Sequence, residues 1–167
     1  MKKLLSLLMA ALLALGRAGE ASPVLPVCES FPSVAYVTPE GEERTLSAVP
    51  GEKPLFLVLF ATWCPDCAAF LPQLDAFVRE REDITVLALS VSADDTPRIL
   101  SSYREAHALT LPMGCAEAGT AGLLRIEWIP TLIVLDASGT LLGRWEEELT
   151  DPEMFPRLAE QFPRAEN

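Results

Sequence analysis

A pair of cysteines between a buried strand and an amphipathic helix is the feature that most constrains the fold of this chain. Residues 55–60 are six consecutive apolar residues between turn signals, which is typical of a strand covered on both faces. Residues 65–81 have apolar side chains at helical spacing, interrupted by Pro72. Trp63-Cys64-Pro65-Asp66-Cys67 stands between them. The sequence therefore predicts a strand, a C-x-x-C loop and a helix in direct succession.

This location favours redox chemistry at the two cysteines. Cys64 is expected at the N-terminus of the helix, where unpaired backbone N–H groups and the helix dipole stabilise a thiolate. Cys67, one turn later, can then resolve a mixed disulfide formed by Cys64. A purely structural disulfide and half of a zinc site are the alternatives. Zinc requires a second ligand pair, but the sequence has no other C-x-x-C and His107 is its only histidine, so no metal site is predicted.

The rest of the chain indicates a single α/β domain with a mixed sheet. Its length of 167 residues suits one domain. The expected elements are a hairpin at 33–37 and 44–46, a strand at 84–91, a helix from 94–96 to about 108, a short helix at 117–124, strands at 131–135 and 140–145, and a helix at 151–161. A parallel strand–helix–strand core followed by an antiparallel hairpin defines this class.

The N-terminus has the layout of a secretory signal peptide. Lys2 and Lys3 precede an apolar run from Leu4 to Leu15, and small residues follow through Ala21. We therefore expect residues 1–21 to be a signal peptide and residues 22–167 to be the mature domain. The predicted location is the periplasm or another exported compartment. The alternative is an uncleaved segment that anchors the protein, and it is the only membrane contact predicted.

The charge of the chain excludes some partners. The formal net charge is −11, and it becomes −13 when residues 1–21 are removed. Nucleic acid and anionic membrane surfaces are poor partners for such a domain. An exported chain meets an oxidising environment, where cysteines can form disulfides.

Three segments together resemble the thioredoxin-like superfamily. Residues 60–67 are similar to its active-site segment, Trp128-Ile129-Pro130-Thr131 to its cis-proline loop, and Pro72 to its helix-kinking proline. The hairpin near the N-terminus and the segment before Pro130 resemble the exported TlpA/ResA-like branch. The resemblance implies a three-layer sandwich, with a mixed central sheet, helices on both faces, an N-terminal β-hairpin and one βα insertion.

The resemblance also implies roles for residues around the cysteines. Pro130 would follow a cis peptide bond and bring the backbone of Ile129 beside the Cys64–Cys67 pair. From the residues alone, an ordinary trans turn would fit equally well. Trp63 would form an apolar wall, and Pro65 and Asp66 would separate the two cysteines at the start of the helix.

Two positions depart from the pattern of the superfamily. Thioredoxins often have a buried acid six residues before the first cysteine, where this chain has Val58. The TlpA/ResA-like branch often has Glu six residues after it, where this chain has Phe70. The proton acceptor for Cys67 is therefore open. Asp66 is one substitute, and its alternative role is a solvated acid that stabilises the helix start.

The remaining two cysteines, Cys28 and Cys115, lie outside these motifs. A second disulfide between them would pin the N-terminal segment to the domain. They could equally be free buried thiols, or one could act as an auxiliary redox thiol or metal ligand. The sequence does not say whether their Cα atoms come within the roughly 7 Å that a disulfide requires.

The predicted function is an exported thiol-disulfide oxidoreductase that needs no cofactor. The resemblance implies a dithiol reductant of other exported proteins, such as an apocytochrome c in maturation, with a membrane thiol carrier as its electron donor. The first alternative is a disulfide oxidase or isomerase, since the same chemistry runs in both directions. The second is a thioredoxin-like binding module in which Cys64–Cys67 is only a structural bridge.

Overall fold

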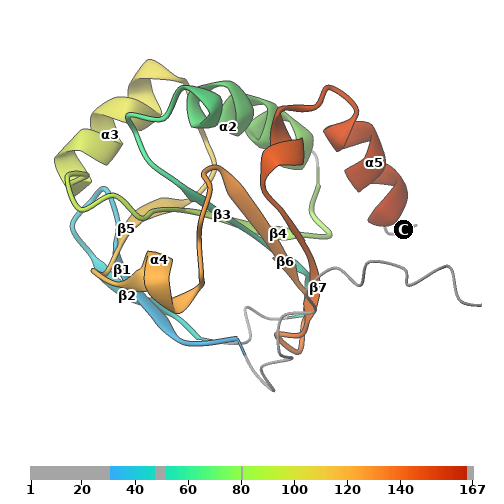
Figure 1. Cartoon of the computed structure of the whole chain (residues 1–167), viewed down its shortest axis with the longest axis horizontal. Coiled ribbons are helices and arrows are strands. Elements are labelled where there is room, and N and C mark those ends of the chain that lie inside the picture. The colour runs from blue at the N-terminus through green and yellow to red at the C-terminus, as the bar shows by residue number, and fades with distance from the viewer. Residues whose placement is uncertain (1–30, 48–51, 80, 165–167) are drawn as a thin grey trace, which may run out of the picture.

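The computed structural model describes residues 31–47, 52–79 and 81–164, which form a seven-stranded mixed sheet with helices against it (Figure 1). The predicted signal peptide, residues 1–21, and Cys28 lie outside the described residues. Within the described part, no helix combines the length and the apolar character needed to cross a bilayer.

One interior strand of the sheet, β3 (Leu55–Phe60), is the apolar segment that the sequence predicts. The strands are β1 Val34–Val37, β2 Glu43–Leu46, β3 Leu55–Phe60, β4 Thr85–Ser90, β5 Met113–Ala116, β6 Thr131–Leu135 and β7 Leu141–Trp145. They are arranged in the order β2-β1-β5-β4-β3-β6-β7. β3 pairs in parallel with β4 and antiparallel with β6, and all six of its residues are buried.

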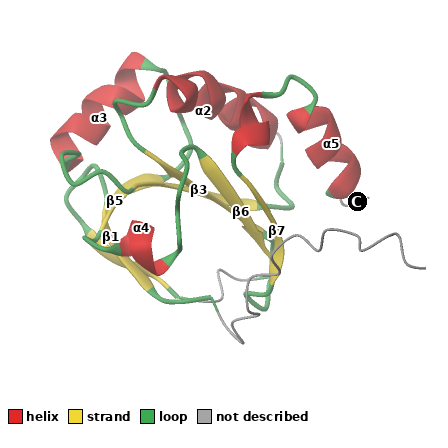
Figure 2. Cartoon of the chain, viewed as in Figure 1, coloured by secondary structure: helices red, strands yellow, loops and turns green. Residues whose placement is uncertain are grey.

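Helices cover the two faces of the sheet unequally (Figure 2). They are α2 Pro65–Val78, α3 Pro97–Ala106, α4 Thr120–Leu123 and α5 Met154–Gln161, and a 3-10 turn, η1, spans Glu147–Thr150. The two crossovers, from β3 to β4 and from β4 to β5, step in the same direction along the sheet. Right-handed crossovers therefore put α2 and α3 on one face, which α5 shares, while α4 lies on the other. The predicted α/β, thioredoxin-like fold class is confirmed.

Alternate residues of β3 contribute to two separate cores. Phe56, Val58 and Phe60 belong to the larger core, which contains residues of α2, α3 and α5. The intervening leucines of β3 belong to a second core, with Leu124 at the end of α4. This alternation follows from the two-residue period of a strand.

Three elements differ from the sequence-based prediction. The short helix expected at 117–124 is α4, which spans only Thr120–Leu123. β5 was not predicted, because Met-Gly-Cys-Ala has neither the β-branched residues nor the alternation of a typical strand. The closing helix was expected to begin at Asp151 but begins at Met154. η1 occupies residues 147–150, and the Asp151 carboxylate accepts a hydrogen bond from the Glu153 N–H at 2.9 Å, which favours a turn before the helix.

Candidate active site

Three loops meet at one edge of the sheet, at the end of β3. Phe60, the last residue of β3, is paired with Ser90, the last residue of β4. β6 runs in the opposite direction, and its first residue, Thr131, is paired with Leu59. The loop after β3, the loop after β4 and the loop before β6 therefore lie together. They carry the predicted cysteine pair, Asp95 and the predicted proline loop, respectively.

Cys64 is the N-cap residue of α2. Its Sγ accepts a hydrogen bond from the backbone N–H of Cys67 at 3.2 Å, and both cysteines are free thiols in this structure. The N–H groups in the first turn of a helix have no intrahelical partner, so a sulfur in this position can satisfy one of them. The same donor stabilises negative charge on Cys64 when the thiol ionises. The structure thus brings the two predicted cysteines together at the start of the helix.

Cys67 is fully buried beneath this position. Burial raises the pKa of the Cys67 thiol well above its usual range, and a hydrogen bond involving the Cys64 side chain raises it further. Negative charge on Cys64 or Asp66 acts in the same direction. Cys67 is therefore a protonated thiol at neutral pH in the dithiol state.

The residues around Cys67 do not include the acids expected from the superfamily pattern. Val58 and Phe70 are both buried in the larger core, where they offer only apolar atoms. Pro65 and Asp66 are exposed at the start of α2. Asp66 acts on Cys67 as a negative charge that raises its pKa, so it disfavours the Cys67 thiolate electrostatically.

The proline loop lies directly against Cys64. The Ile129–Pro130 peptide bond is cis, as the resemblance implies. The Cys64 thiol donates to the backbone carbonyl of Ile129, with Sγ and O 3.5 Å apart. The predicted proximity of Ile129 to the cysteine pair is therefore present in the structure.

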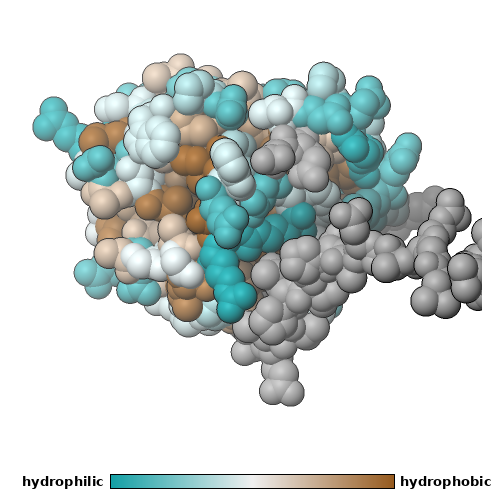
Figure 3. Space-filling view, viewed as in Figure 1, coloured by the Kyte–Doolittle hydropathy of each residue, from teal (hydrophilic) through white to brown (hydrophobic). Residues whose placement is uncertain are grey.

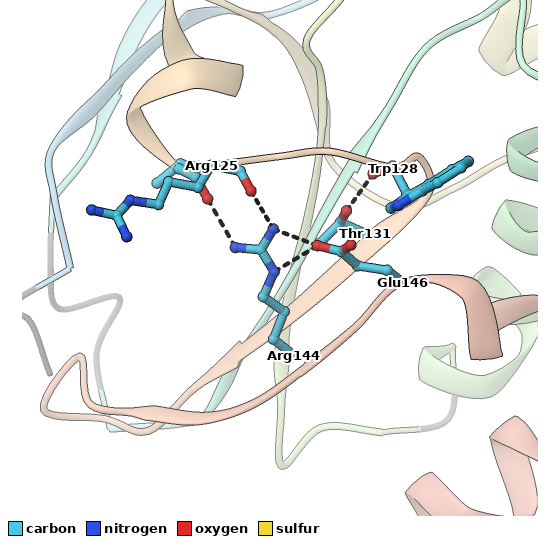
Figure 4. Close-up of polar contacts among 6 residues, drawn as sticks. Arg125, Trp128, Thr131, Arg144 and Glu146 are labelled. Carbon is cyan, nitrogen blue, oxygen red and sulfur yellow. Dashed lines mark hydrogen bonds and ion pairs between the residues drawn. The ribbon is translucent and has the colours of Figure 1, made fainter. Parts of the chain in front are cut away.

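Side chains from two strands hold this loop at both ends (Figure 4). Arg144 of β7 donates to the carbonyl oxygens of Leu124 and Arg125, at 2.9 and 2.6 Å, and is paired with Glu146. At the other end, the Thr131 hydroxyl donates to the Trp128 carbonyl at 2.5 Å. These contacts fix the backbone on either side of residues 126–127. Nothing in the sequence motif indicated a role for Arg144.

Two tryptophan side chains stand in solvent on the loops of this edge. Trp63 is 66% exposed and Trp128 is 57% exposed. The Trp63 Nε1–H donates to the Ser92 hydroxyl at 3.1 Å, which orients its ring against the loop after β4. Figure 3 shows further apolar patches on the half of the molecule that carries α3 and α4, where Ile99 and Leu123 are exposed.

Asp95 is a buried carboxylate just before α3, in the segment where the sequence predicts only the start of a helix. Its two oxygens accept from the Thr62 N–H at 2.9 Å, from the Thr62 hydroxyl at 2.5 Å and from the Ser90 hydroxyl at 2.5 Å. The cap of α3 is instead Thr96, whose Oγ1 accepts from the Ile99 N–H. Asp95 therefore links the loop after β4 to the residue two positions before Cys64.

Cys115 lies on β5, away from the cysteine pair in sequence and opposite Ser90 in register. It is a half-buried free thiol, and burial raises its pKa to about 11, with a further contribution from Asp95. Cys28, its predicted partner, is outside the described residues, so their pairing stays a prediction. Among the residues described, no three metal-ligating side chains are grouped so that they could hold an ion.

Comparisons with known proteins agree with this fold. The chain is 26% identical over 132 residues to the thioredoxin-like protein YneN of Bacillus subtilis, covering 78% of this chain and 77% of that protein. It is 21% identical over 143 residues to the thiol-disulfide oxidoreductase ResA of Bacillus thuringiensis, covering 83% and 80%. A solved thiol-disulfide oxidoreductase from Bacteroides fragilis superposes with a TM-score of 0.62 at 22% identity, over 80% of this chain and 99% of that one.

The predicted class, a thioredoxin-like thiol-disulfide oxidoreductase that resembles the TlpA/ResA-like branch, is confirmed by these relatives. The AhpC/TSA family matches residues 27–143, and the chain belongs to this family.

Proposed function

We propose that Cys64 and Cys67 are the redox-active pair of this oxidoreductase and that it reduces disulfides in other exported proteins. The observation that carries the proposal is the position of Cys64 Sγ. It lies at the start of α2, within hydrogen-bonding distance of both the Cys67 N–H and the Ile129 carbonyl. A sulfur so placed has a donor for its negative charge and a second thiol one turn away.

The reaction proceeds through two exchanges. The Cys64 thiolate attacks one sulfur of a client disulfide, forming a mixed disulfide and releasing the first client sulfur as a thiolate. The Cys67 thiolate then attacks Cys64 Sγ. The Cys64–Cys67 bond forms, the bond to the client breaks, and the second client sulfur leaves as a thiolate that water protonates. The client gains two electrons and the enzyme is oxidised by two.

The decisive experiment traps the intermediate. Cys67→Ser removes the resolving thiol, so a disulfide-containing client protein should remain attached to Cys64 and be visible by non-reducing electrophoresis. Cys64→Ser is the matched control and should trap nothing. If neither variant traps a client and the wild type reduces no disulfide, the chain is a binding module and the proposal is wrong.

Whether the protein reduces or oxidises its clients has to be measured separately, because the same residues serve a reductase, an oxidase or an isomerase. We infer a reductant that receives electrons from a membrane thiol carrier, which predicts a Cys64–Cys67 reduction potential near the thioredoxin value of about −270 mV. The mature protein would be equilibrated in dithiothreitol or glutathione buffers, with Cys28 and Cys115 replaced by Ser in a parallel sample. A potential near about −120 mV would instead make the protein a disulfide donor.

The proposal that the protein is exported rests on the sequence of residues 1–21. Expression of the full chain in a bacterium should give a periplasmic product whose N-terminus begins after Ala18 or Ala21, measured by intact mass. A cytoplasmic product that retains Met1 would overturn the proposed location. Apocytochrome c is the proposed class of client, and reduction of its haem-binding cysteine pair is the corresponding assay.

A further inference from the structure

The Tyr103 hydroxyl is buried without a partner. Tyr103 is 8% exposed, and its ring lies against Phe60, with centroids 5.8 Å apart, and His107, with centroids 4.3 Å apart. Among the residues that the structure describes, its Oη is the one buried side-chain oxygen or nitrogen without a hydrogen-bond partner. Burying an unpaired hydroxyl destabilises a fold, and Phe would fill the same space without that penalty. The oxygen therefore requires an explanation other than packing.

The surroundings of the Tyr103 hydroxyl connect it with the cysteine pair. Tyr103 belongs to the same buried cluster as Cys64 and Cys67. Phe60, against which its ring lies, directly precedes the loop that leads to Cys64. After burial, which is the largest cause, negative charge on Cys67, Cys64 and Asp95 raises the pKa of Tyr103, to about 12. The phenol is therefore a neutral hydrogen-bond donor at physiological pH, within electrostatic range of both sulfurs.

Cys67 needs such a donor when it acts. It is fully buried, and two positions that could have supplied a polar group hold Val58 and Phe70. Its backbone N–H is already directed at Cys64 Sγ. Yet the second exchange of the proposed function requires Cys67 as a thiolate. A backbone hydrogen bond with Ala61 favours this thiolate, but burial outweighs it, so a second donor would lower the cost of ionising Cys67.

We propose that the Tyr103 hydroxyl donates a hydrogen bond to Cys67 Sγ as this sulfur becomes a thiolate and attacks the mixed disulfide. This inference rests on the proposed function and adds one catalytic residue to it. In the dithiol state the Tyr103 hydroxyl has no hydrogen-bond partner, so it has to move into hydrogen-bonding range of Cys67 Sγ as this sulfur ionises. Tyr103 keeps its own proton throughout. The Cys67 proton goes to water, and the departing client thiolate takes a proton from water, so the proton count balances.

The test separates the two exchanges with Ellman's reagent, 5,5′-dithiobis(2-nitrobenzoic acid), as the disulfide. In protein with Cys28 and Cys115 replaced by Ser, attack by Cys64 releases a first thionitrobenzoate and resolution by Cys67 releases a second. Stopped-flow absorbance should show that Tyr103→Phe slows the second release by about tenfold, the size expected for a lost hydrogen bond to a charged group. The first release should stay close to that of the wild type.

Tyr36→Phe is the matched control, because it removes the same atom from the chain's other tyrosine. Tyr36 is half-buried and packs against the second core, on the opposite face of the sheet. Neither release should change in this variant. The pH profile of the second release should also shift to higher pH in Tyr103→Phe alone.

Several titratable groups near Cys67 and Tyr103 contribute to the pH profile of the second release. Cys64 and Asp66 act on Cys67 from its own helix. Asp95, from the loop before α3, acts on Tyr103. His107, the residue that follows α3, contacts the Tyr103 ring. All four are unchanged in the Tyr103→Phe protein, so a shift confined to that variant belongs to the hydroxyl.

The outcomes distinguish this inference from the function on which it rests. A melting temperature that rises by about 3 °C in Tyr103→Phe, with a second release within twofold of the wild type, would mean that the hydroxyl has no kinetic role and would overturn the inference. If the wild type released no thionitrobenzoate from Cys64, the proposed function itself would fail. A slower second release with a normal first release supports both.

Discussion

At the scale of single residues, the carboxylate of Asp95 has the most specific set of contacts at the site. It joins Thr62, two positions before Cys64, to Ser90 at the end of β4. The Asp95 carboxylate is the acceptor in all three hydrogen bonds. An amide in place of this carboxylate would direct an NH₂ group at a donor. The position of the cysteine loop therefore depends on a residue about thirty positions away in the chain.

We expect Asp95→Asn to lower the free energy of unfolding by about 1–3 kcal/mol and to slow the attack by Cys64 several-fold. The reason is that Thr62 loses a charged acceptor for two donors. Urea unfolding and the first thionitrobenzoate release would measure the two effects. Asp94→Asn is the control, since Asp94 is exposed next to it in sequence and should change neither. Equal effects in the two variants would contradict this assignment.

The residues proposed to carry the chemistry were predictable from the sequence, and the residues that hold them in place were not. Cys64, Cys67, Ile129 and Pro130 were predicted from motifs, and the structure brings them together. Asp95 could not be found in this way, because one acid before a helix has the same appearance in sequence whether it caps that helix or turns inward. Only the pairing of β3 with β4 brings it to Thr62.

At the scale of elements, a buried acid connects α2 to the segment before β5. Asp75 Oδ1 accepts from the Thr110 N–H, the Thr110 hydroxyl and the Leu111 N–H, at 2.8–3.0 Å. Its other oxygen is paired with Arg79 at 2.5 Å. Burial raises the pKa of Asp75, but the hydrogen bonds from Arg79, Thr110 and Leu111 outweigh it, so its pKa lies below the usual range.

A lowered folded-state pKa means that Asp75 contributes stability above the ordinary Asp pKa of about 4 and loses it as the pH falls through its own pKa. Asp75→Asn should therefore destabilise the protein by about 1–3 kcal/mol at pH 7 and flatten the decline of stability below about pH 4. Thermal unfolding at pH 7 and at pH 3 measures this. Asp66→Asn, at an exposed position of the same helix, should leave the stability at pH 7 nearly unchanged. An equal loss for Asp75→Asn at both values would contradict the linkage.

The loop between α4 and β6 depends on Arg144. Lys in its place can reach one carbonyl but lacks the planar fork that contacts Leu124 and Arg125 together. We expect Arg144→Lys to speed hydrogen exchange of the amides of residues 125–129 and to weaken capture of a client by Cys67→Ser protein. Arg125→Lys, whose exposed side chain points away from this network in Figure 4, is the control. Unchanged exchange in Arg144→Lys would remove Arg144 from the positioning of this loop.

The sequence predicted strands and helices correctly where the pattern of apolar residues was long. The prediction failed where that pattern was short. β3 was predicted to the residue because it is apolar on both faces. The four residues of β5 have no such pattern, and they form a strand because the edges of β1 and β4 are available on either side. The start of α5 shifted because a local turn at Asp151 competes with the helix.

For the molecule as a whole, three cysteine and tyrosine side chains with raised pKa values predict that the folded state loses stability at alkaline pH. Burial raises the pKa of Cys115 to about 11 and that of Tyr103 to about 12, and raises that of Cys67 further. A raised folded-state pKa gives stability that is complete below the unfolded value and is lost as the pH rises through the folded one.

The reduced protein should therefore lose stability steadily from about pH 9 upward. Cys115→Ser should make this decline shallower between about pH 9 and 11, since one of the contributing thiols is gone. Urea unfolding of the two proteins at pH 7, 9 and 10.5, in the presence of a reductant, measures the difference. Parallel curves for the wild type and Cys115→Ser would show that Cys115 titrates in the folded state as it does in the unfolded chain.

The distance along the chain between Cys64 and Ile129 also matters while the protein is being made. Cys64 precedes the carbonyl that it contacts by 65 residues, and synthesis proceeds from the N-terminus. A growing chain can thus form β3, α2 and β4 before β6 exists, with one edge of β3 still open. During that interval Cys64 lacks its contact with the Ile129 carbonyl, which only the loop before β6 supplies. We therefore expect the two thiols to be more accessible in the nascent chain than in the finished fold.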